Sequence, residues 1–293
     1  MLDGSGSGNG VTTGKNLSFV NAGVTGRSSG VYGYDIDIKQ ASTRSTHTGT
    51  VALTQQIIDA EEQITITESG RKVNFRTTAG TNIEQTMNQL SNAMKESGVN
   101  VELVTPKGDS AIRNAPQTLT LRHTKYGSEP FFQVSSNTGG LLSSVANVSE
   151  RVKNGLDVAG EIAKEAARGR GQVLTGSGGV GSKAEGIAIR YKGMNPPPAG
   201  QRAGSLTFTQ NSLNFHIGSN SNQTASVSFK SSRAQNLGSG VDNDSGFSSF
   251  ADINLMTGTG ARDSLDIIDK AINDVAANRG YMGAFQKNTL ESN

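Results

Sequence analysis

The stretch from residue 262 to residue 293 constrains the fold more than any other part of the sequence. It reads as one helix whose apolar residues recur with alternating steps of three and four. These residues are Leu265, Ile268, Ile272, Val275 and Met282. A seam of this period is typical of a helix that packs against a partner helix, because it is too narrow to cover a broad core. The sequence therefore predicts assembly with other helices.

The end of this helix gives a second reason for that interpretation. Arg279 stands where a further apolar residue is due, and the seam becomes polar at Gln286 and Thr289. Neither Gly nor Pro follows to end the helix, so the pattern is that of a helix cut from a longer protein. The alternative is that the helix docks on its own domain, as amphipathic helices at chain ends commonly do. The narrow seam and the missing stop signal favour assembly.

Composition favours a structural role over an enzymatic one. Only 33% of the residues are apolar and 5% aromatic, whereas 37 of 293 are Gly, so thin β-rich layers are favoured over one large core. The length is sufficient for two or three compact units. The net charge is +2 without a basic stripe, which argues against a nucleic-acid partner. The chain has no Cys, which excludes disulfides.

The sequence also bears on location. No stretch approaches the 18 apolar residues that a membrane-spanning helix needs, so no membrane insertion is expected. The N-terminus lacks the basic start and apolar core of a secretory signal. If the protein is exported, we expect a route that does not use a cleaved signal peptide.

The first half of the chain predicts a small β-β-α-β unit. Residues 34–39 alternate as a strand, and residues 63–67 and 72–76 form a hairpin across a Glu-Ser-Gly turn. Thr81 is the expected cap of a helix that ends at Gly98. The apolar face of this helix comprises Ile83, Met87, Leu90 and Met94. A strand at 99–103 follows, and the helix is expected to cover one face of the resulting sheet.

The second half predicts short antiparallel strands between many turns. The expected strands are residues 119–121, 131–134, 187–191, 205–209, 213–217 and 225–229. A short helix is expected at 144–153. The predicted division has five parts. Residues 1–60 are a linker and the start of the stalk or outer region, 61–135 the β-β-α-β module, 136–235 a second β-rich outer domain, 236–261 a turn-rich return and 262–293 the terminal helix.

Candidate catalytic and metal-binding patterns fail on their spacing. The glycine run 176–181 lacks the Lys-Ser/Thr of a phosphate-binding loop. The segment 242–246 resembles the start of a calcium loop, but Ile253 stands where the loop needs an acidic residue. The three histidines lie far apart in sequence and have no partners at metal-ligand spacing; they are His47, His123 and His216. We therefore expect no enzyme activity, no metal and no cofactor.

Several segments carry a family resemblance. The C-terminal stalk helix of bacterial flagellin closely resembles two segments, Asp263 to Ile272 and Arg279 to Ser292. Met282 to Leu290 matches the Leu-Gly-Ala-x-Gln-Asn-Arg-Leu element of that helix, with a shift of one residue near its end. Leu2 to Gly4 resembles the end of the N-terminal stalk, and residues 74–101 resemble the inserted module of flagellins. Residues 157–162 and 169–176 resemble outer-domain segments of long flagellins and of the filament cap protein. Together these segments span most of the chain.

The resemblance implies an extracellular flagellar filament subunit of the α+β class, elongated, with β-rich outer domains and a stalk helix. The chain then lacks the N-terminal stalk helices and the extreme C-terminus, so we expect a soluble, monomeric fragment of a protein that self-associates when complete. It also implies an innate immune receptor as a partner, with Arg279 and Gln286 on that surface, although bundle contacts explain these residues more simply. The alternatives are a hook-filament junction or cap protein, and a carbohydrate-binding or adhesive surface module.

Overall fold

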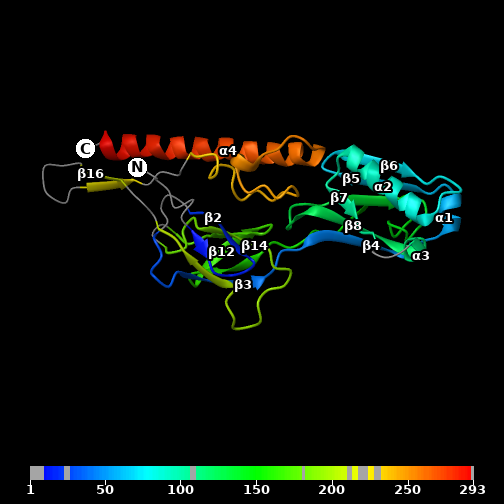
Figure 1. Ribbon diagram of the computed structural model, residues 1–293, viewed down its shortest axis with the longest axis horizontal. Coiled ribbons are helices and arrows are strands. Elements are labelled where there is room, and N and C mark those ends of the chain that lie inside the picture. The colour runs from blue at the N-terminus through cyan, green and yellow to red at the C-terminus, as the bar shows by residue number, and fades with distance from the viewer. Residues whose placement is uncertain are drawn as a thin grey trace. The chain divides into compact units, whose positions relative to one another are not determined.

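The computed structural model describes residues 10–22, 27–105, 110–179, 182–209, 213–216, 224–227 and 232–291. The chain divides into two compact units (Figure 1). Unit 1 combines residues 1–41 with residues 157–293, and unit 2 consists of residues 42–156. Unit 2 is therefore an insertion into unit 1. The five-part division expected from the sequence stays a prediction.

The chain enters and leaves unit 2 at a narrow neck. Within unit 2, the Thr43 backbone N–H donates to the Leu156 carbonyl at 2.9 Å, and the Leu156 N–H donates to the Thr43 hydroxyl at 2.9 Å. On the unit 1 side, the Gln40 amide donates to the Asp157 carbonyl at 2.8 Å. The two crossing segments thus run side by side.

Unit 1 is built on an eight-stranded antiparallel sheet in the order β1-β15-β3-β11-β12-β13-β14-β2. The strands are β1 (Val11–Thr12), β2 (Leu17–Asn21), β3 (Tyr34–Gln40), β11 (Ala159–Ile162), β12 (Glu165–Arg170), β13 (Val173–Gly176), β14 (Ala188–Tyr191) and β15 (Gly204–Thr207). The end strands β1 and β2 are consecutive in the chain, and the Thr12 hydroxyl donates to the Leu17 carbonyl at 2.9 Å. The sheet therefore curls into a near-barrel.

The core of unit 1 fills the inside of this sheet. It includes Ile36, Ile38, Val158, Ile162, Leu174, Ile189, Leu206 and Phe208. Two glycines allow the strands to approach, because a Cβ at Gly160 would collide with the Asp37 carbonyl and one at Gly169 with the Val158 carbonyl. In Figure 1 the blue β2 and β3 lie among the green β12 and β14, so residues from both ends of the chain build one sheet.

The rest of unit 1 follows β15. A hairpin pairs β16 (Leu213–His216) with β17 (Thr224–Val227). A short 3₁₀ turn η1 (Phe250–Asp252) precedes the long helix α4 (Gly258–Phe285), which continues as the π-helical turn η2 (Gln286–Leu290). None of the described helices combines the length and hydropathy required to cross a membrane.

Unit 2 packs two antiparallel sheets and one long helix around a shared core. The four-stranded sheet contains β10 (Glu150–Arg151), β9 (Gln133–Ser136), β5 (Gln63–Glu68) and β6 (Arg71–Arg76), in that order. The three-stranded sheet contains β4 (Arg44–Leu53), β8 (Gln117–Tyr126) and β7 (Val101–Leu103). The helices are α1 (Gln55–Asp59), α2 (Ile83–Ser97) and α3 (Ser110–Arg113).

Helix α2 forms where the periodicity predicts it, and its buried side chains enter the core with residues of both sheets. Its cap differs from the prediction. Asn82, not Thr81, is the N-cap, and a capping box joins Asn82 and Gln85. The Thr81 hydroxyl instead donates to the Thr78 carbonyl at 2.7 Å. The left-handed Gly98 ends the helix as expected.

The α+β fold class is confirmed, but the β-β-α-β unit is not a single sheet. The order β5, β6, α2, β7 is as predicted. However, β7 pairs with β8 and belongs to the three-stranded sheet. The local pattern identified the elements correctly but not the long-range pairing, which depends on a strand that follows later in the chain.

The helix predicted at 144–153 is wrong. This segment consists of turns and the short strand β10. The Glu150 carboxylate accepts the Ser144 backbone N–H at 2.7 Å, and Asn147 has φ of 61°. Such side-chain acceptors compete with helical hydrogen bonds, which explains the turn.

The remaining expectations concern chain ends and turns. Val11 and Thr12 form β1 within the range 1–60, which was expected to include a linker. Residues 2–4, which carry part of the family resemblance, lie outside the described residues. The same holds for 180–181 of the glycine run, 217 and 228–229 of the two predicted strands, and 292–293 of the terminal helix.

Candidate helix-docking groove

Helix α4 exposes much of the apolar seam that the sequence identified. The exposed fractions are 59% for Leu265, 62% for Ile272, 37% for Val275 and 42% for Met282. Only Ile268 is half-buried. An apolar row of this kind on a helix surface is the pattern of an interaction face.

A neighbouring stripe of α4 packs on the rest of unit 1, and most of its residues are small or acidic. Its buried residues are Gly260, Asp263, Ser264, Ile267, Ala271 and Asp274. Asp263, Ile267 and Asp274 contact residues 232–252, a segment that we call the strap. Because the helix buries this stripe, most residues of the apolar seam lie at the edge of the contact or beyond it.

The two buried aspartates hold the strap by its backbone. Asp263 Oδ2 accepts hydrogen bonds from the Asp244 N–H at 3.1 Å, the Ser245 N–H at 2.9 Å and the Ser245 hydroxyl at 2.7 Å. Asp274 Oδ2 accepts the Gly238 N–H at 3.2 Å. Hydrogen bonds to a carboxylate are stronger than neutral ones, so these contacts fix where the strap lies along the helix.

The strap is also tied to the sheet. The Arg190 side chain on β14 donates to the Val241 carbonyl at 2.7 Å. Burial lowers the pKa of the Arg190 guanidinium, while the charge of Asp242 opposes that shift. Gly238 has φ of 65°, and a Cβ there would collide with Ile267. The strap thus follows one defined path between α4 and the sheet.

The start of α4 lies further upstream than the sequence suggested. Thr257 is the N-cap, and its hydroxyl accepts the Gly260 N–H at 2.9 Å. The helix therefore begins at Gly258 rather than at residue 262. Asp263, expected near the helix start, is instead the buried acceptor for the strap.

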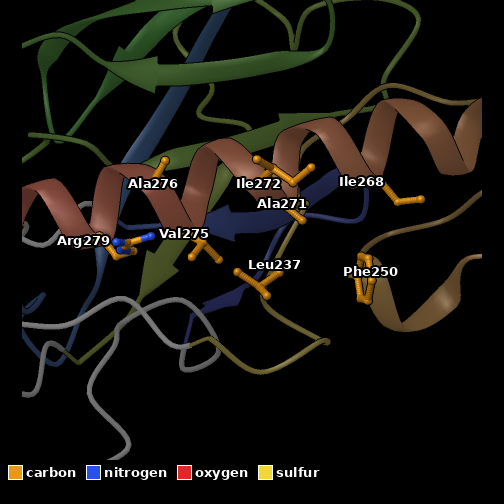
Figure 2. A pocket seen from close by; sticks show the side chains of 8 residues that line it. All are labelled: Leu237, Phe250, Ile268, Ala271, Ile272, Val275, Ala276 and Arg279. Carbon is orange, nitrogen blue, oxygen red and sulfur yellow. The ribbon is translucent and has the colours of Figure 1, made fainter.

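The strap and α4 enclose an apolar groove of ≈450 Å³ (Figure 2). It is lined by Leu237, Phe250, Ile268, Ala271, Ile272, Val275, Ala276 and Arg279. In Figure 2, Leu237 and Phe250 stand on the strap side and the other residues come from the helix. Among the described residues that line the groove, Arg279 is the one that is charged, so the groove combines an apolar floor with a cationic end.

The structure brings together part of the predicted seam. Ile268, Ile272 and Val275 line the groove, whereas Leu265 and Met282 do not. Of the two residues expected on the receptor surface, Arg279 and Gln286, only the first lines the groove. The exposed Gln286 belongs to η2, and its amide donates to Glu291 at 3.0 Å.

Sequence reasoning missed Leu237 and Phe250. Both are isolated apolar residues in a turn-rich segment and carry no periodic signal. A signal did exist for the buried aspartates, because Asp263, Ile267, Ala271 and Asp274 recur at helical spacing as a second stripe.

The other candidate chemistry has structural explanations. The segment 242–246 donates its N–H groups to Asp263. His216 is exposed, and His47 Nε2 lies 2.5 Å from the Leu142 carbonyl. Across the described ranges, no three His, Cys, Asp or Glu side chains gather as a metal site would require. His123 does have an acidic neighbour in space, Glu68, which its sequence position did not reveal.

No family model and no curated protein matches the chain. Solved structures of similar fold include the flagellar cap protein FliD D2-D3 domains from Escherichia coli, with 13% identity and a TM-score of 0.45, covering 69% of this chain and 98% of that one. The D2-D3 domains from Serratia marcescens have 11% identity and a TM-score of 0.41, covering 66% and 97%. The cap protein from Bdellovibrio bacteriovorus has 10% identity and a TM-score of 0.35, covering 68% and 99%. These values describe a distant likeness in fold.

Proposed function

We propose that this chain is part of an extracellular structural protein of the bacterial flagellum, without enzymatic activity. The observation that carries the proposal is the terminal helix. Its sequence from Arg279 to Ser292 resembles the flagellin stalk, and its apolar seam is exposed on α4. An exposed seam on a helix anchored by its other face suits assembly with a partner helix.

The helix resemblance favours the filament subunit as the particular position in the flagellum. The filament cap is the second candidate, since the three solved structures described above are all named as flagellar cap proteins. In either position, the β-rich units would project outward and α4 would face neighbouring subunits. A surface adhesin that binds carbohydrate is a third alternative, which a glycan array would favour through tight and specific binding.

Immunogold labelling of whole cells of the source bacterium tests the proposal and separates its versions. With antibodies raised against unit 2, label along the whole filament identifies a filament subunit. Label confined to the distal tip identifies the cap, and label at the filament base identifies the junction. Surface label that is absent from every flagellum would overturn the flagellar proposal.

The groove gives a second test, in the flagellar protein to which this chain is proposed to belong. Ile272→Asp places a charge on the 62%-exposed seam residue, so subunit assembly should fall by at least tenfold by sedimentation. Asn273→Asp adds the same charge at the next, exposed position of the helix. It should assemble normally. If both variants assembled as well as the unaltered protein, the seam would be rejected as the contact between subunits.

Receptor recognition through Arg279 and Gln286 remains a separate proposal. The positive charge of Arg279 suits an acidic receptor surface. The same side chain is also in a position to contact a neighbouring subunit. A reporter assay with the complete protein distinguishes these roles. Arg279→Ala should reduce receptor signalling without reducing assembly if the residue serves recognition.

A further inference from the structure

Unit 2 contains a buried pair of titratable side chains, remote in sequence from the groove. Glu68 is the last residue of β5 and is 4% exposed, and His123 in the middle of β8 is 1% exposed. His123 Nε2 lies 3.6 Å from Glu68 Oε1. Burying a carboxylate is costly unless several donors compensate for the lost water.

The donors around Glu68 come from different elements. The Ser69 hydroxyl, in the turn after β5, donates to Oε1 at 2.6 Å. The Asn100 backbone N–H, just before β7, donates to Oε2 at 3.2 Å. Since β5 belongs to the four-stranded sheet, whereas β7 and β8 belong to the three-stranded one, this single carboxylate contacts both sheets.

The orientation of His123 suits a charged Glu68. The Lys125 backbone N–H donates to His123 Nδ1 at 2.9 Å, so the ring proton resides on Nε2 and points toward the carboxylate. Other charged residues on the adjoining elements have different contacts. Arg71 on β6 donates to the Gly98 carbonyl at 2.9 Å, and Arg122 pairs with Glu102 at 2.6 Å.

The environment favours the charged form of Glu68. Burial alone raises the pKa of the Glu68 carboxyl, but the His123 side chain, the Ser69 hydroxyl and the Asn100 N–H outweigh it and lower the pKa from 4.5 to about 2. The carboxyl therefore binds its proton less readily in the folded chain than in the unfolded one. The stabilisation is complete well above pH 4.5 and is lost as the pH falls from 4.5 to about 2.

We propose that the Glu68 carboxylate is an acid-sensitive latch between the two sheets of unit 2, which joins them when charged and releases them when protonated. Protonation removes the negative charge that the Asn100 N–H and the Ser69 hydroxyl stabilise, and it weakens the attraction to His123. The buried polar connection between the two sheets is then weaker. This device is independent of the flagellar assignment.

The test measures unfolding of unit 2 in the full chain at pH 6 and at pH 3. Pulsed hydrogen exchange in denaturant, read by mass spectrometry on peptides from β5 and β8, gives the unfolding equilibrium constant of this unit. Protonation of Glu68 should make this unfolding constant about 30-fold larger at pH 3 than at pH 6. In Glu68→Gln the side chain cannot titrate, so this 30-fold component should disappear.

Glu62→Gln is the matched control. Glu62 is 3% exposed and accepts the Thr138 N–H at 2.9 Å and the Thr138 hydroxyl at 2.6 Å. Within the described part of the chain, these side-chain contacts do not join the two sheets. It should retain the 30-fold component. The latch is rejected if Glu68→Gln keeps the pH dependence of the unaltered chain.

A direct titration covers the case in which Glu68→Gln does not fold. The side-chain carboxyl ¹³C shift of Glu68, followed by NMR in the unaltered full chain, should titrate near pH 2. A midpoint at pH 4.5 or above would overturn the latch, because the folded state would then have no preference for the charged form.

Discussion

Helices α2 and α4 show two opposite uses of an amphipathic helix. In α2, the apolar residues Ile83, Met87, Leu90 and Met94 are all at most 4% exposed and complete the core of unit 2. In α4, two aspartates, small residues and Ile267 are buried, while four of the five seam residues are exposed. The first helix finds its apolar partners within its own unit.

This difference shows that a hydrophobic stripe does not by itself identify the face that a helix buries. In α4 the backbone of the strap is the partner, and backbone N–H groups need acceptors. Carboxylates at Asp263 and Asp274 supply them. Most of the apolar seam then stays exposed, as the proposed assembly role requires.

The sharpest test of the comparison removes one apolar side chain from each helix. Leu90→Ala should destabilise unit 2 by about 3 kcal/mol, because Leu90 is 1% exposed and the substitution leaves a cavity. Ile272→Ala should change the stability of unit 1 by less than about 0.5 kcal/mol, since its side chain is 62% exposed. Chemical denaturation, with hydrogen exchange to assign each unit, measures both. Similar losses would contradict the contrast between the helices.

A smaller effect is expected at the buried polar face of α4. Asp263→Ala leaves the N–H groups of Asp244 and Ser245 without their acceptor and should destabilise unit 1 by about 2 kcal/mol. Asp269→Ala, at an exposed position of the same helix, serves as the control and should cost less than about 0.5 kcal/mol. Faster hydrogen exchange in the strap of Asp263→Ala, absent from the control, would locate the effect.

The smallest of these effects concerns the caps. Asn82→Ala removes the capping box of α2 and should cost about 1 kcal/mol. Thr81→Ala leaves that box intact, so it should cost less, although Thr81 is the cap that the sequence suggested. A larger loss for Thr81→Ala in thermal unfolding would show that the helix starts elsewhere.

Local patterns predicted much of the fold. The β5–β6 hairpin and α2 follow from alternation and helical spacing, since their signals lie within a few residues of each other. The pairing of β7 with β8 and of β1 with β15 could not be read in this way. Strand β1 bonds to a strand near residue 205, and the intervening sequence contains no pattern that specifies this partner.

The candidate groove was predictable only in part. The periodicity of the seam identified Ile268, Ile272 and Val275, because a helix repeats its exposed face at fixed spacing. Leu237 and Phe250 come from irregular backbone, whose path depends on the aspartates of α4 and on Arg190. Sequence alone carries no rule that places such a segment along a helix.

The neck between the units has a mechanical consequence. Thr43 and Leu156 are hydrogen-bonded where the chain enters and leaves unit 2, so both ends of the insertion start from one point. A force that pulled Gln40 and Asp157 apart would load these short bonds before it reached the rest of the 42–156 segment.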